Sequence, residues 1–475
     1  MIGRRVLAGA GGLLLPAVLI LLWFGMARGQ GVAARPEAPL PGGDPFTPPL
    51  SITVEMYRLT ASGAQRLPLT MCSADDTAFG CTAFCSESGY GCPGDAIFPY
   101  PYLTGTITVG VETDYLLDVV PREMGPWYDP VALEAQAVAA RSFAFYYTAS
   151  PPTLLPYNNS ASFQAFIPRT FERQFPENYP NDEDFQWDDP CGAQYEQLNS
   201  AQQLVCDALR EFAYLSYGDQ SPLRAQFSAD AYGQTVDGST AGLEAVPDPI
   251  STACDADNLG HGRGMSQEGA SRWARGNECS YPGAPVVGDN PPGGAWSVAW
   301  QRDQILAHYY TGIHLRGPDG EQLTPDYRWN PLAVDWGVPG NQPPVFSYPL
   351  SIPITIWVQN TGTTTWLTGT VGMVQVWKPA NPTGTLTGTF RTAITLTRWM
   401  TPGGSAQVPL TLTTGMLPAP GVYTLTIDLA VADGSGGWLL FSQAEPARPW
   451  FPLSMVVGVD AAPVRLYLPL VGHDP

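Results

Sequence analysis

The sequence predicts an α+β domain with disulfide-bearing insertions, followed by an all-β domain of the sandwich type. Three observations indicate this: an alanine-rich helix signal that begins near residue 130, eight cysteines that all lie between Cys72 and Cys279, and a change in composition at about Val345. Beyond that point the chain consists of short runs rich in Val, Ile, Thr and Trp. At roughly 150 residues per unit, a chain of 475 residues has room for about three units.

The first segment is typical of an exported protein. Arg4 and Arg5 precede an apolar run over residues 6–26, and small residues follow it. Residues 1–34 are therefore expected to be a signal peptide or a membrane anchor, and the length of the run leaves both open. In either case the rest of the chain lies outside the cytoplasm. Residues 35–50 are rich in proline and glycine and are expected to form a linker.

The next segments alternate between strand and helix signals. Residues 51–58 and 102–112 alternate in the manner of strands. The strongest helix signal follows, because Asp129 can cap the free N–H groups of a first turn and Pro130 suits the first helical position. Residues 199–214 carry a second helical pattern.

A glutamate lies just before the capped helix. The apolar run over residues 116–120 leads into a turn that contains Glu123 beside proline, methionine and tryptophan. A carboxyl group in apolar surroundings has a raised pKa and can act as an acid. From the spacing alone, a solvated turn glutamate is the alternative. Glu134, on an exposed-looking helix position, is a weaker candidate acid.

Four blocks of sequence carry a family resemblance. Residues 115–124 read Y-L-L-D-V-V-P-R-E-M, residues 132–142 read A-L-E-A-Q-A-V-A-A-R-S, residues 260–270 read G-H-G-R-G-M-S-Q-E-G-A, and residues 305–312 read I-L-A-H-Y-Y-T-G. In this order they resemble the signature of the stage II sporulation protein D and amidase-enhancer family (SpoIID/LytB). The resemblance covers about residues 100–315 and implies a SpoIID-like domain over residues 51–316.

The resemblance implies a function and a site. Its best-studied members are lytic transglycosylases that act on peptidoglycan glycan strands, and their catalytic glutamate falls on Glu123. Alternatives are a non-catalytic glycan-binding protein that stimulates an N-acetylmuramoyl-L-alanine amidase, and an exported adhesion or scaffold protein. The residues expected to bind substrate are Arg141, Gln136, Gln164, Ser228, His261, Arg263 and Gln267. For Arg141 a second role is open, in which it supports the turn backbone.

A lytic transglycosylase can work with one carboxylate. The glutamate protonates the leaving oxygen and then accepts the proton of the substrate's own C6 hydroxyl, which attacks the anomeric carbon and forms a 1,6-anhydro end. The attack is intramolecular and benefits from proximity. One obvious carboxylate, Glu123, fits this scheme better than the two-carboxylate scheme of many hydrolases.

The sequence departs from the family pattern at several positions. Ser228 stands where the family usually has histidine, and Tyr232 stands where it has the first of two glycines. Some relatives bind zinc with a cysteine at the position of Ala231, so no metal is expected here. Glu268 replaces an aromatic residue that is common in the family. The changed segment also favours the amidase-enhancer alternative.

Cysteine count and charge limit the class of protein further. An even number of cysteines in an exported chain favours disulfides over a metal site, since no C-x-x-C pair occurs. The expected pairings fall within two local groups, one of Cys72, Cys81, Cys85 and Cys92 and one of Cys191, Cys206, Cys254 and Cys279. No cofactor is expected. A net charge of −20 argues against nucleic acid as a partner.

The C-terminal part is expected to form a separate sandwich. Residues 317–344 resemble a linker, residues 345–460 the sandwich, and residues 461–475 a tail. The predicted strands are residues 351–359, 368–377, 390–396, 406–411, 421–430 and 437–442. The turn at residues 360–366, with Trp357, Trp377 and Trp399, resembles the Ig-like four-tryptophan module. A chain that ends near Gly317 is therefore expected to fold alone.

Overall fold

The computed structural model describes a large part of the chain. The described residues are 46–55, 57–59, 66–68, 106–149, 154–155, 164, 166, 171, 190–254, 256–276, 279, 299–336, 351–380, 390–396, 399–415, 417–432 and 437–459. The expected export segment, most of the first linker, the first group of four cysteines and the C-terminal tail lie outside them. Within them, no helix has the length and apolar character needed to cross a bilayer.

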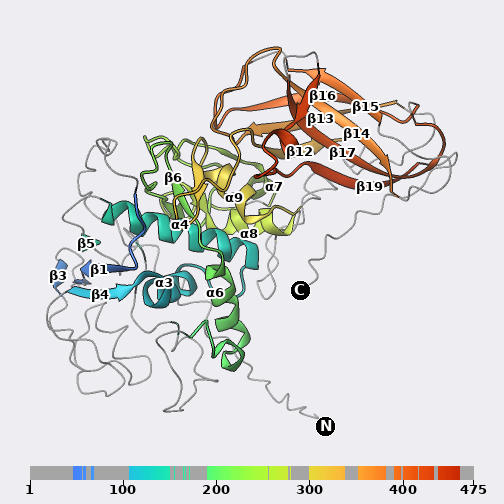
Figure 1. Cartoon of the computed structure of the whole chain (residues 1–475). Helices are drawn as coiled ribbons and strands as arrows, with labels where there is room; N and C mark the ends of the chain where they lie inside the picture. The colour runs from blue at the N-terminus through green and yellow to red at the C-terminus, as the bar shows by residue number, and fades with distance from the viewer. Residues whose placement is uncertain are drawn as a thin grey trace, which may run out of the picture.

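The helix α4 (Pro130–Thr148) forms the centre of the first domain (Figure 1). The predicted cap is confirmed, because the Asp129 side chain accepts a hydrogen bond of 3.0 Å from the Val131 N–H and Pro130 takes the first helical position. Its many alanines leave room for neighbouring elements on every side, and most of the helix is buried. An all-round apolar helix of this kind belongs inside a domain rather than on its surface.

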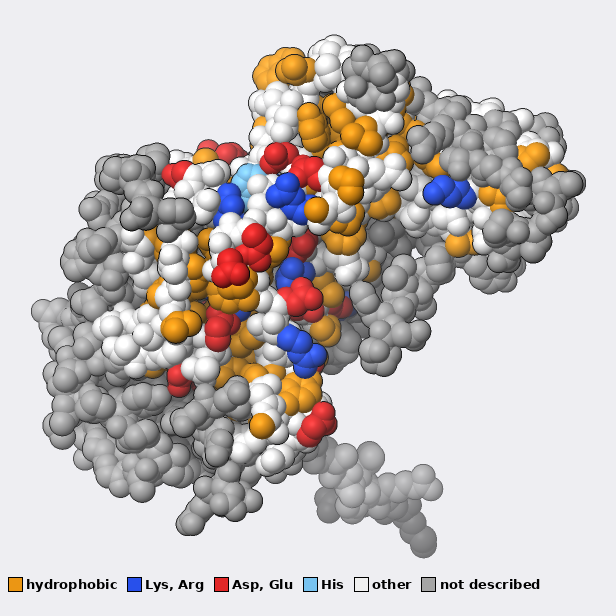
Figure 2. Space-filling model, viewed as in Figure 1, with side chains coloured by type: hydrophobic (Ala, Val, Ile, Leu, Met, Phe, Trp, Pro, Cys, Tyr) orange, Lys and Arg blue, Asp and Glu red, His pale blue; other side chains and the backbone are white. Residues whose placement is uncertain are grey.

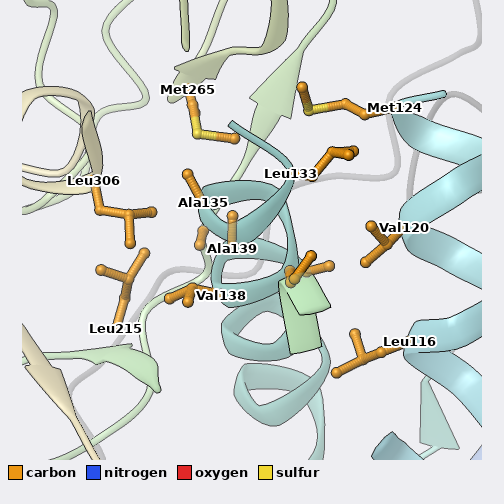
Figure 3. Packing of buried hydrophobic residues seen from close by; sticks show 14 of the residues in the cluster. Leu116, Val120, Met124, Leu133, Ala135, Val138, Ala139, Leu215, Met265 and Leu306 are labelled. Carbon is orange, nitrogen blue, oxygen red and sulfur yellow. The ribbon is translucent and has the colours of Figure 1, made fainter. Parts of the chain in front are cut away.

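The segment before α4 differs from its prediction. Residues 116–123 form the helix α3 (Leu116–Glu123), which follows a single π-helical turn, η2 (Val111–Tyr115). Glu123 is thus the last residue of a helix and does not lie on a free turn. The helix forms because its apolar residues recur on one face: Leu116, Val120 and the following Met124 point toward α4, as Figure 3 shows. The opposite side of α4 packs against other elements.

Short strands and helices complete the first domain. A three-stranded sheet has the order β4-β1-β5, so the two predicted N-terminal strands pair with each other. The helix predicted over residues 199–214 ends earlier, since α6 stops at Arg210 and Tyr214 begins a strand. The remaining elements, in chain order, are β1 (Ser51–Glu55), β2 (Tyr57–Leu59), β3 (Arg66–Pro68), β4 (Thr106–Gly110), β5 (Leu154–Leu155), η4 (Tyr195–Gln197), α6 (Ser200–Arg210), β6 (Tyr214–Ser216), β7 (Phe227–Ser228), β8 (Gly233–Gln234), β9 (Pro247–Asp248), α7 (Pro249–Ala253), β10 (Met265–Ser266), α8 (Gln267–Arg275), α9 (Arg302–Tyr309) and β11 (His314–Arg316).

Among the described residues, two disulfides hold this domain. Cys191 is bonded to Cys206, with 5.3 Å between their Cα atoms, and Cys254 is bonded to Cys279, with 5.2 Å between theirs. Both pairs fall within the second predicted group of four cysteines. Disulfides persist in oxidising compartments, which agrees with an extracytoplasmic protein.

The described part of the C-terminal region is rich in strands, which form two sheets. One sheet has the order β12-β13-β16, and the other has the order β15-β14-β17-β18 with β19 also paired to β17. Side chains of both sheets belong to a single buried core. The elements are β12 (Trp329–Asp335), β13 (Ser351–Asn360), β14 (Val371–Pro379), β15 (Phe390–Thr395), β16 (Ser405–Thr413), β17 (Gly421–Ala432), β18 (Trp438–Leu440), α10 (Phe441–Ala444) and β19 (Leu453–Val459).

Two predictions about this region need correction. Part of the segment expected to be a linker forms β12, which pairs with β13 and begins the first sheet. Its proline at position 331 and scattered polar residues hid the strand signal. The strand β19 was not predicted. Of the tryptophans, Trp366 and Trp377 are buried in the core, whereas Trp399 is exposed on the surface.

The two parts of the chain lie against each other (Figure 1) and share buried contacts. The His308 ring Nδ1 of α9 lies 2.6 Å from Oε1 of Gln359 in β13, and the Asn330 amide donates to the carbonyl of Gln304. Leu332 belongs to the core of the first domain, and Ala307 of α9 belongs to the core of the two sheets. The described contacts therefore join the parts into one folded body.

Candidate active site

The candidate catalytic residue, Glu123, is half-buried at the C-terminal end of α3. Its backbone carbonyl oxygen accepts a hydrogen bond of 3.3 Å from Nε2 of Gln267, the first residue of α8. The same nitrogen lies 3.3 Å from Oε1 of Gln136, which is fully buried on α4. Two residues predicted to bind substrate thus join Glu123 to the central helix, which places three of the predicted site residues together.

Two short paired strands, the second of which leads into α8, determine the position of Gln267. The strand β10 runs parallel to β7, with Met265 paired to Phe227 and Ser266 paired to Ser228. Ser266 then caps α8, because its hydroxyl accepts a hydrogen bond of 2.9 Å from the Gly269 N–H. The strand fixes where α8 begins and therefore where Gln267 points.

Two glycines of the 260–270 block are required by close contacts. Gly264 has a φ of +68°, and a Cβ at this position would lie 1.9 Å from the carbonyl oxygen of Gln226. At Gly269, a Cβ would lie 2.2 Å from the Tyr309 hydroxyl oxygen. A side chain at Gly264 would meet the Gln226 backbone and shift β10, which leads into α8, whereas one at Gly269 would displace the Tyr309 side chain.

The loop after Glu123 is fixed to α8 at two further points. The Tyr128 hydroxyl donates a hydrogen bond of 2.7 Å to Oε1 of Glu268, and the Asp129 N–H donates to the Ser271 hydroxyl over 3.1 Å. Burial raises the pKa of the Glu268 carboxyl above its ordinary value, although the Tyr128 hydrogen bond and the Arg272 charge oppose this. From the sequence, Glu268 was noted only as a departure from the family pattern, and nothing there showed its partner.

Gln164 lies close to the site but is buried. Its Oε1 accepts a hydrogen bond from the Tyr115 hydroxyl, and its Nε2 donates to the Ala140 carbonyl of α4 over 3.1 Å. Burial, and after it the charge of Glu123, raise the pKa of Tyr115 well above its ordinary value. The Glu123 carboxylate is therefore within electrostatic reach of Tyr115, and Gln164 holds the hydroxyl of that tyrosine through a hydrogen bond.

The structure places Arg141 in a different environment from Glu123. Its guanidinium is fully buried and forms a two-point ion pair with Glu112, with distances of 2.7 Å and 2.6 Å. It also donates to the Ala213 carbonyl over 2.9 Å and lies 4.8 Å above the Phe212 ring. These contacts favour the supporting role over contact with a substrate.

The other predicted substrate residues lie around the glycine-rich loop before β10. Ser228 is buried, and its hydroxyl has no hydrogen-bond partner among the described residues. His261 and Arg263 are exposed, and Nδ1 of His261 accepts a hydrogen bond of 3.0 Å from the Arg263 N–H. Although the side chain is exposed, partial desolvation of the ring and then the charges of Arg263 and Arg224 lower the pKa of His261 to about 4. The ring is thus neutral at physiological pH.

A buried polar cluster lies beneath α8 and was not foreseen. Arg272 forms a two-point ion pair with Asp230 at 2.8 Å and 2.9 Å, and Asp248 accepts hydrogen bonds from Tyr309 at 2.8 Å and from Ser251 at 3.0 Å. Burial raises the pKa of Asp248 to about 6. These residues are spread over some eighty positions of the chain, so no sequence spacing could have shown that they meet.

The described residues contain no group of three or more His, Cys, Asp or Glu side chains that could hold a metal ion. On the face shown in Figure 2, acidic and basic side chains are interspersed with apolar ones.

The comparisons with known proteins address the central segment of the first domain. A search of the curated proteins gives no match to this chain. Among protein families, the model described as SpoIID, stage II sporulation protein, matches residues 103–203. These residues include α3, α4 and Glu123, whereas Gln267 and the 260–270 block lie beyond them. The part of the chain that carries the candidate acid is therefore similar to the stage II sporulation protein SpoIID, a similarity that points to a role connected with the cell wall.

Proposed function

We propose that this protein is an exported lytic transglycosylase that cleaves the glycan strands of peptidoglycan, with Glu123 as its acid and then its base. The observation that carries the proposal is the position of Glu123, which is half-buried at the end of α3 and held at its backbone by Gln267 and, through it, by Gln136. A catalytic group must be held in a productive geometry. The SpoIID match over residues 103–203 supports the assignment.

The reaction would run in two proton transfers. Protonated Glu123 gives its proton to the glycosidic oxygen, and the bond between that oxygen and the anomeric carbon breaks. The C6 hydroxyl of the same sugar then forms a bond to the anomeric carbon, and its proton passes to the Glu123 carboxylate. The products are one strand with a free hydroxyl, one strand with a 1,6-anhydro end, and a protein in its starting protonation state.

The surroundings of Glu123 support a scheme with one carboxylate. The side chains that hold its backbone, Gln267 and Gln136, are amides, which position a group but do not exchange protons with it near neutral pH. Glu268, the carboxylate on the neighbouring turn of α8, accepts the Tyr128 hydrogen bond. This hydrogen bond holds the Glu268 carboxyl against the loop that follows Glu123, so we assign Glu268 a positioning role.

A second candidate function rests on Ser228. This residue occupies the position where the resembling family usually has histidine, and its buried hydroxyl has no partner among the described residues. If the missing imidazole is needed for turnover, the protein would bind glycan strands without cleaving them and stimulate a separate N-acetylmuramoyl-L-alanine amidase. We place this candidate second because Ser228 does not contact Glu123 in any described interaction.

One experiment separates the two functions. Purified protein is incubated with glycan strands prepared from peptidoglycan, and the products are analysed by mass spectrometry. Anhydro-ended fragments support the transglycosylase, whereas fragments with reducing ends would indicate hydrolysis and contradict it. Strands that are bound but remain intact favour the enhancer, which is then tested by adding an amidase.

A further inference from the structure

We propose that Trp127 forms an aromatic subsite that binds one sugar ring of the glycan strand next to the bond that Glu123 cleaves. The identity of the ligand rests on the proposed function, whereas the subsite itself rests on the placement of the indole. Trp127 lies four residues after Glu123, on the loop between α3 and α4. Four residues span at most about 14 Å of chain, so the indole lies within reach of sugar rings that flank the reacting bond.

The Trp127 indole is exposed but held in place. Its side chain is 39% exposed, so part of the indole faces the solvent. The six-membered ring lies against Gly125, where a Cβ would be 2.2 to 2.4 Å from three of its carbon atoms. Gly125 thus provides the space that allows the indole to lie flat against the loop, with part of its surface open to water.

The neighbouring contacts fix the loop that carries the indole. The Trp127 ring centroid lies 6.2 Å from that of Tyr128, with 31° between the ring planes. The Tyr128 hydroxyl donates a hydrogen bond to Glu268. The backbone N–H of Tyr128 donates a second one, of 3.2 Å, to the Gly125 carbonyl. An aromatic surface that is fixed before binding loses little conformational entropy when a ligand arrives. This is the property expected of a binding surface rather than of a side chain left outside by chance.

The flat apolar face of an indole favours a sugar ring as the ligand. A pyranose ring presents a face of C–H groups that stacks on an aromatic ring, while its hydroxyls stay in water at the edge. Binding sites for such ligands combine aromatic walls with a few polar groups. Here the polar groups at hand are the Glu123 carboxyl and Glu268, which can accept hydrogen bonds from sugar hydroxyls. A protein partner would be the alternative occupant, but the position four residues from the candidate acid favours the substrate.

The subsite is tested by binding, in a protein that does not consume the ligand. The Glu123→Gln variant serves as background, and isothermal titration calorimetry with glycan strands freed of peptide stems measures the dissociation constant. Adding Trp127→Ala should weaken binding at least tenfold, in line with the effect of truncating a central tryptophan at an interface. Trp127→Phe should weaken binding less, because it keeps a flat ring.

Two further variants keep the test independent of folding. Gly125→Ala leaves the tryptophan in the chain but displaces the indole, so it should weaken binding about as much as Trp127→Ala does. Trp399→Ala removes another exposed tryptophan, 65% exposed and located between β15 and β16, and should leave the dissociation constant unchanged. Melting temperatures of all variants are measured alongside.

The outcomes are distinct for this inference and for the proposed function. Unchanged binding in both Trp127→Ala and Gly125→Ala overturns the subsite, whether or not the wild-type protein cleaves glycan. Weakened binding in these two variants, with Trp399→Ala unaffected, supports the subsite even if no cleavage is found, in which case only the transglycosylase assignment fails. If Trp127→Ala does not fold, the Gly125→Ala and Trp127→Phe results decide.

Discussion

The side-chain amide of Gln267 donates a hydrogen bond of 3.3 Å to the backbone carbonyl oxygen of Glu123, across 144 positions of the chain. The carbonyl belongs to the last residue of a helix, where no further turn supplies a donor for it. Gln267 therefore completes the end of α3 and fixes the position of the candidate acid. This relationship explains why a block of sequence far from Glu123 matters to the site.

Gln267→Ala should slow turnover on glycan strands by about ten- to a hundredfold, because a small displacement of a catalytic group reduces its effect strongly. The substitution also removes the donor that the half-buried Glu123 carbonyl and the buried Gln136 amide oxygen share, which should lower the free energy of unfolding by about 1–3 kcal/mol. Steady-state kinetics should show the loss in kcat rather than in KM. The matched control is Gln407→Ala on the exposed face of β16, which should behave as the wild type in both measurements.

Arg141→Ala should destabilise the protein rather than weaken glycan binding alone. The variant leaves Glu112 without its partner and opens a cavity between α4 and the residue 212–213 segment. Breaking a buried pair costs about 3–5 kcal/mol, and since the Glu112 side chain is 37% exposed we expect about 2–3 kcal/mol. Urea unfolding of Arg141→Ala and wild type measures this loss in the free energy of unfolding.

A surface pair gives the comparison for Arg141. Arg210 and Asp207 form an ion pair at 2.7 Å on α6, with side chains 67% and 42% exposed. Arg210→Ala should change the free energy of unfolding by no more than a few tenths of a kcal/mol. If Arg141→Ala is as stable as Arg210→Ala while glycan binding falls, Arg141 binds substrate as the family resemblance first suggested.

The Asp248→Asn variant should show a stability difference from wild type that depends on pH. Burial raises the folded-state pKa of Asp248 to about 6, above the value near 4 of an unfolded chain. The folded protein therefore holds this proton more tightly, and the resulting stability is present below pH 4 and is lost as the pH rises through 6. The variant carries no such charge, so it should gain on the order of 3 kcal/mol relative to wild type between pH 4 and pH 7.

The test uses the difference in stability between Asp248→Asn and wild type, because other titrating groups change the stability of both proteins with pH in the opposite direction. Burial lowers the pKa of His308 to about 4, so protonation of this residue destabilises both proteins as the pH falls below about 6.5. That effect cancels in the comparison of Asp248→Asn with wild type. Stability curves that run parallel from pH 4 to pH 7 would contradict the assigned environment of Asp248.

A chain cut after Gly317 should fold poorly, contrary to what its composition suggests. The cut removes Gln359, the partner of His308, and exposes Ala307 and other residues that face the sheets. It also removes Leu332 from the core of the first domain. We expect a lower melting temperature and self-association on size-exclusion chromatography. A monomeric fragment that melts like the full chain would show that the shared contacts contribute little.

The parts of the fold that could be predicted from the sequence are those with local causes. The cap at Asp129 and the alanines of α4 identify a buried helix, and alternating Val, Ile and Thr identify the strands β13 to β17 within a few residues. Both disulfides fall within the local group expected for them. Residues 116–123 were not recognised as a helix because a proline near its end suggested a turn.

Three of the residues predicted for the site lie together in the structure, whereas their roles in binding and catalysis stay predictions. Glu123, Gln136 and Gln267 were named together only through the family resemblance, and the structure places them in contact. Partners such as Glu112 for Arg141 and Tyr128 for Glu268 depend on which elements pack together, and no periodicity in the sequence records that. The immunoglobulin-like character of the C-terminal sheets remains a prediction.

The most direct test of the central claim is product analysis with Glu123→Gln. This variant keeps the size and hydrogen-bonding capacity of the side chain but cannot deliver a proton, and a general acid–base group contributes about 10²–10⁴-fold in rate. We predict that Glu123→Gln binds glycan strands and melts like the wild type but forms almost no anhydro-ended products. Formation of these products at close to the wild-type rate would contradict the assignment of Glu123 as the catalytic residue.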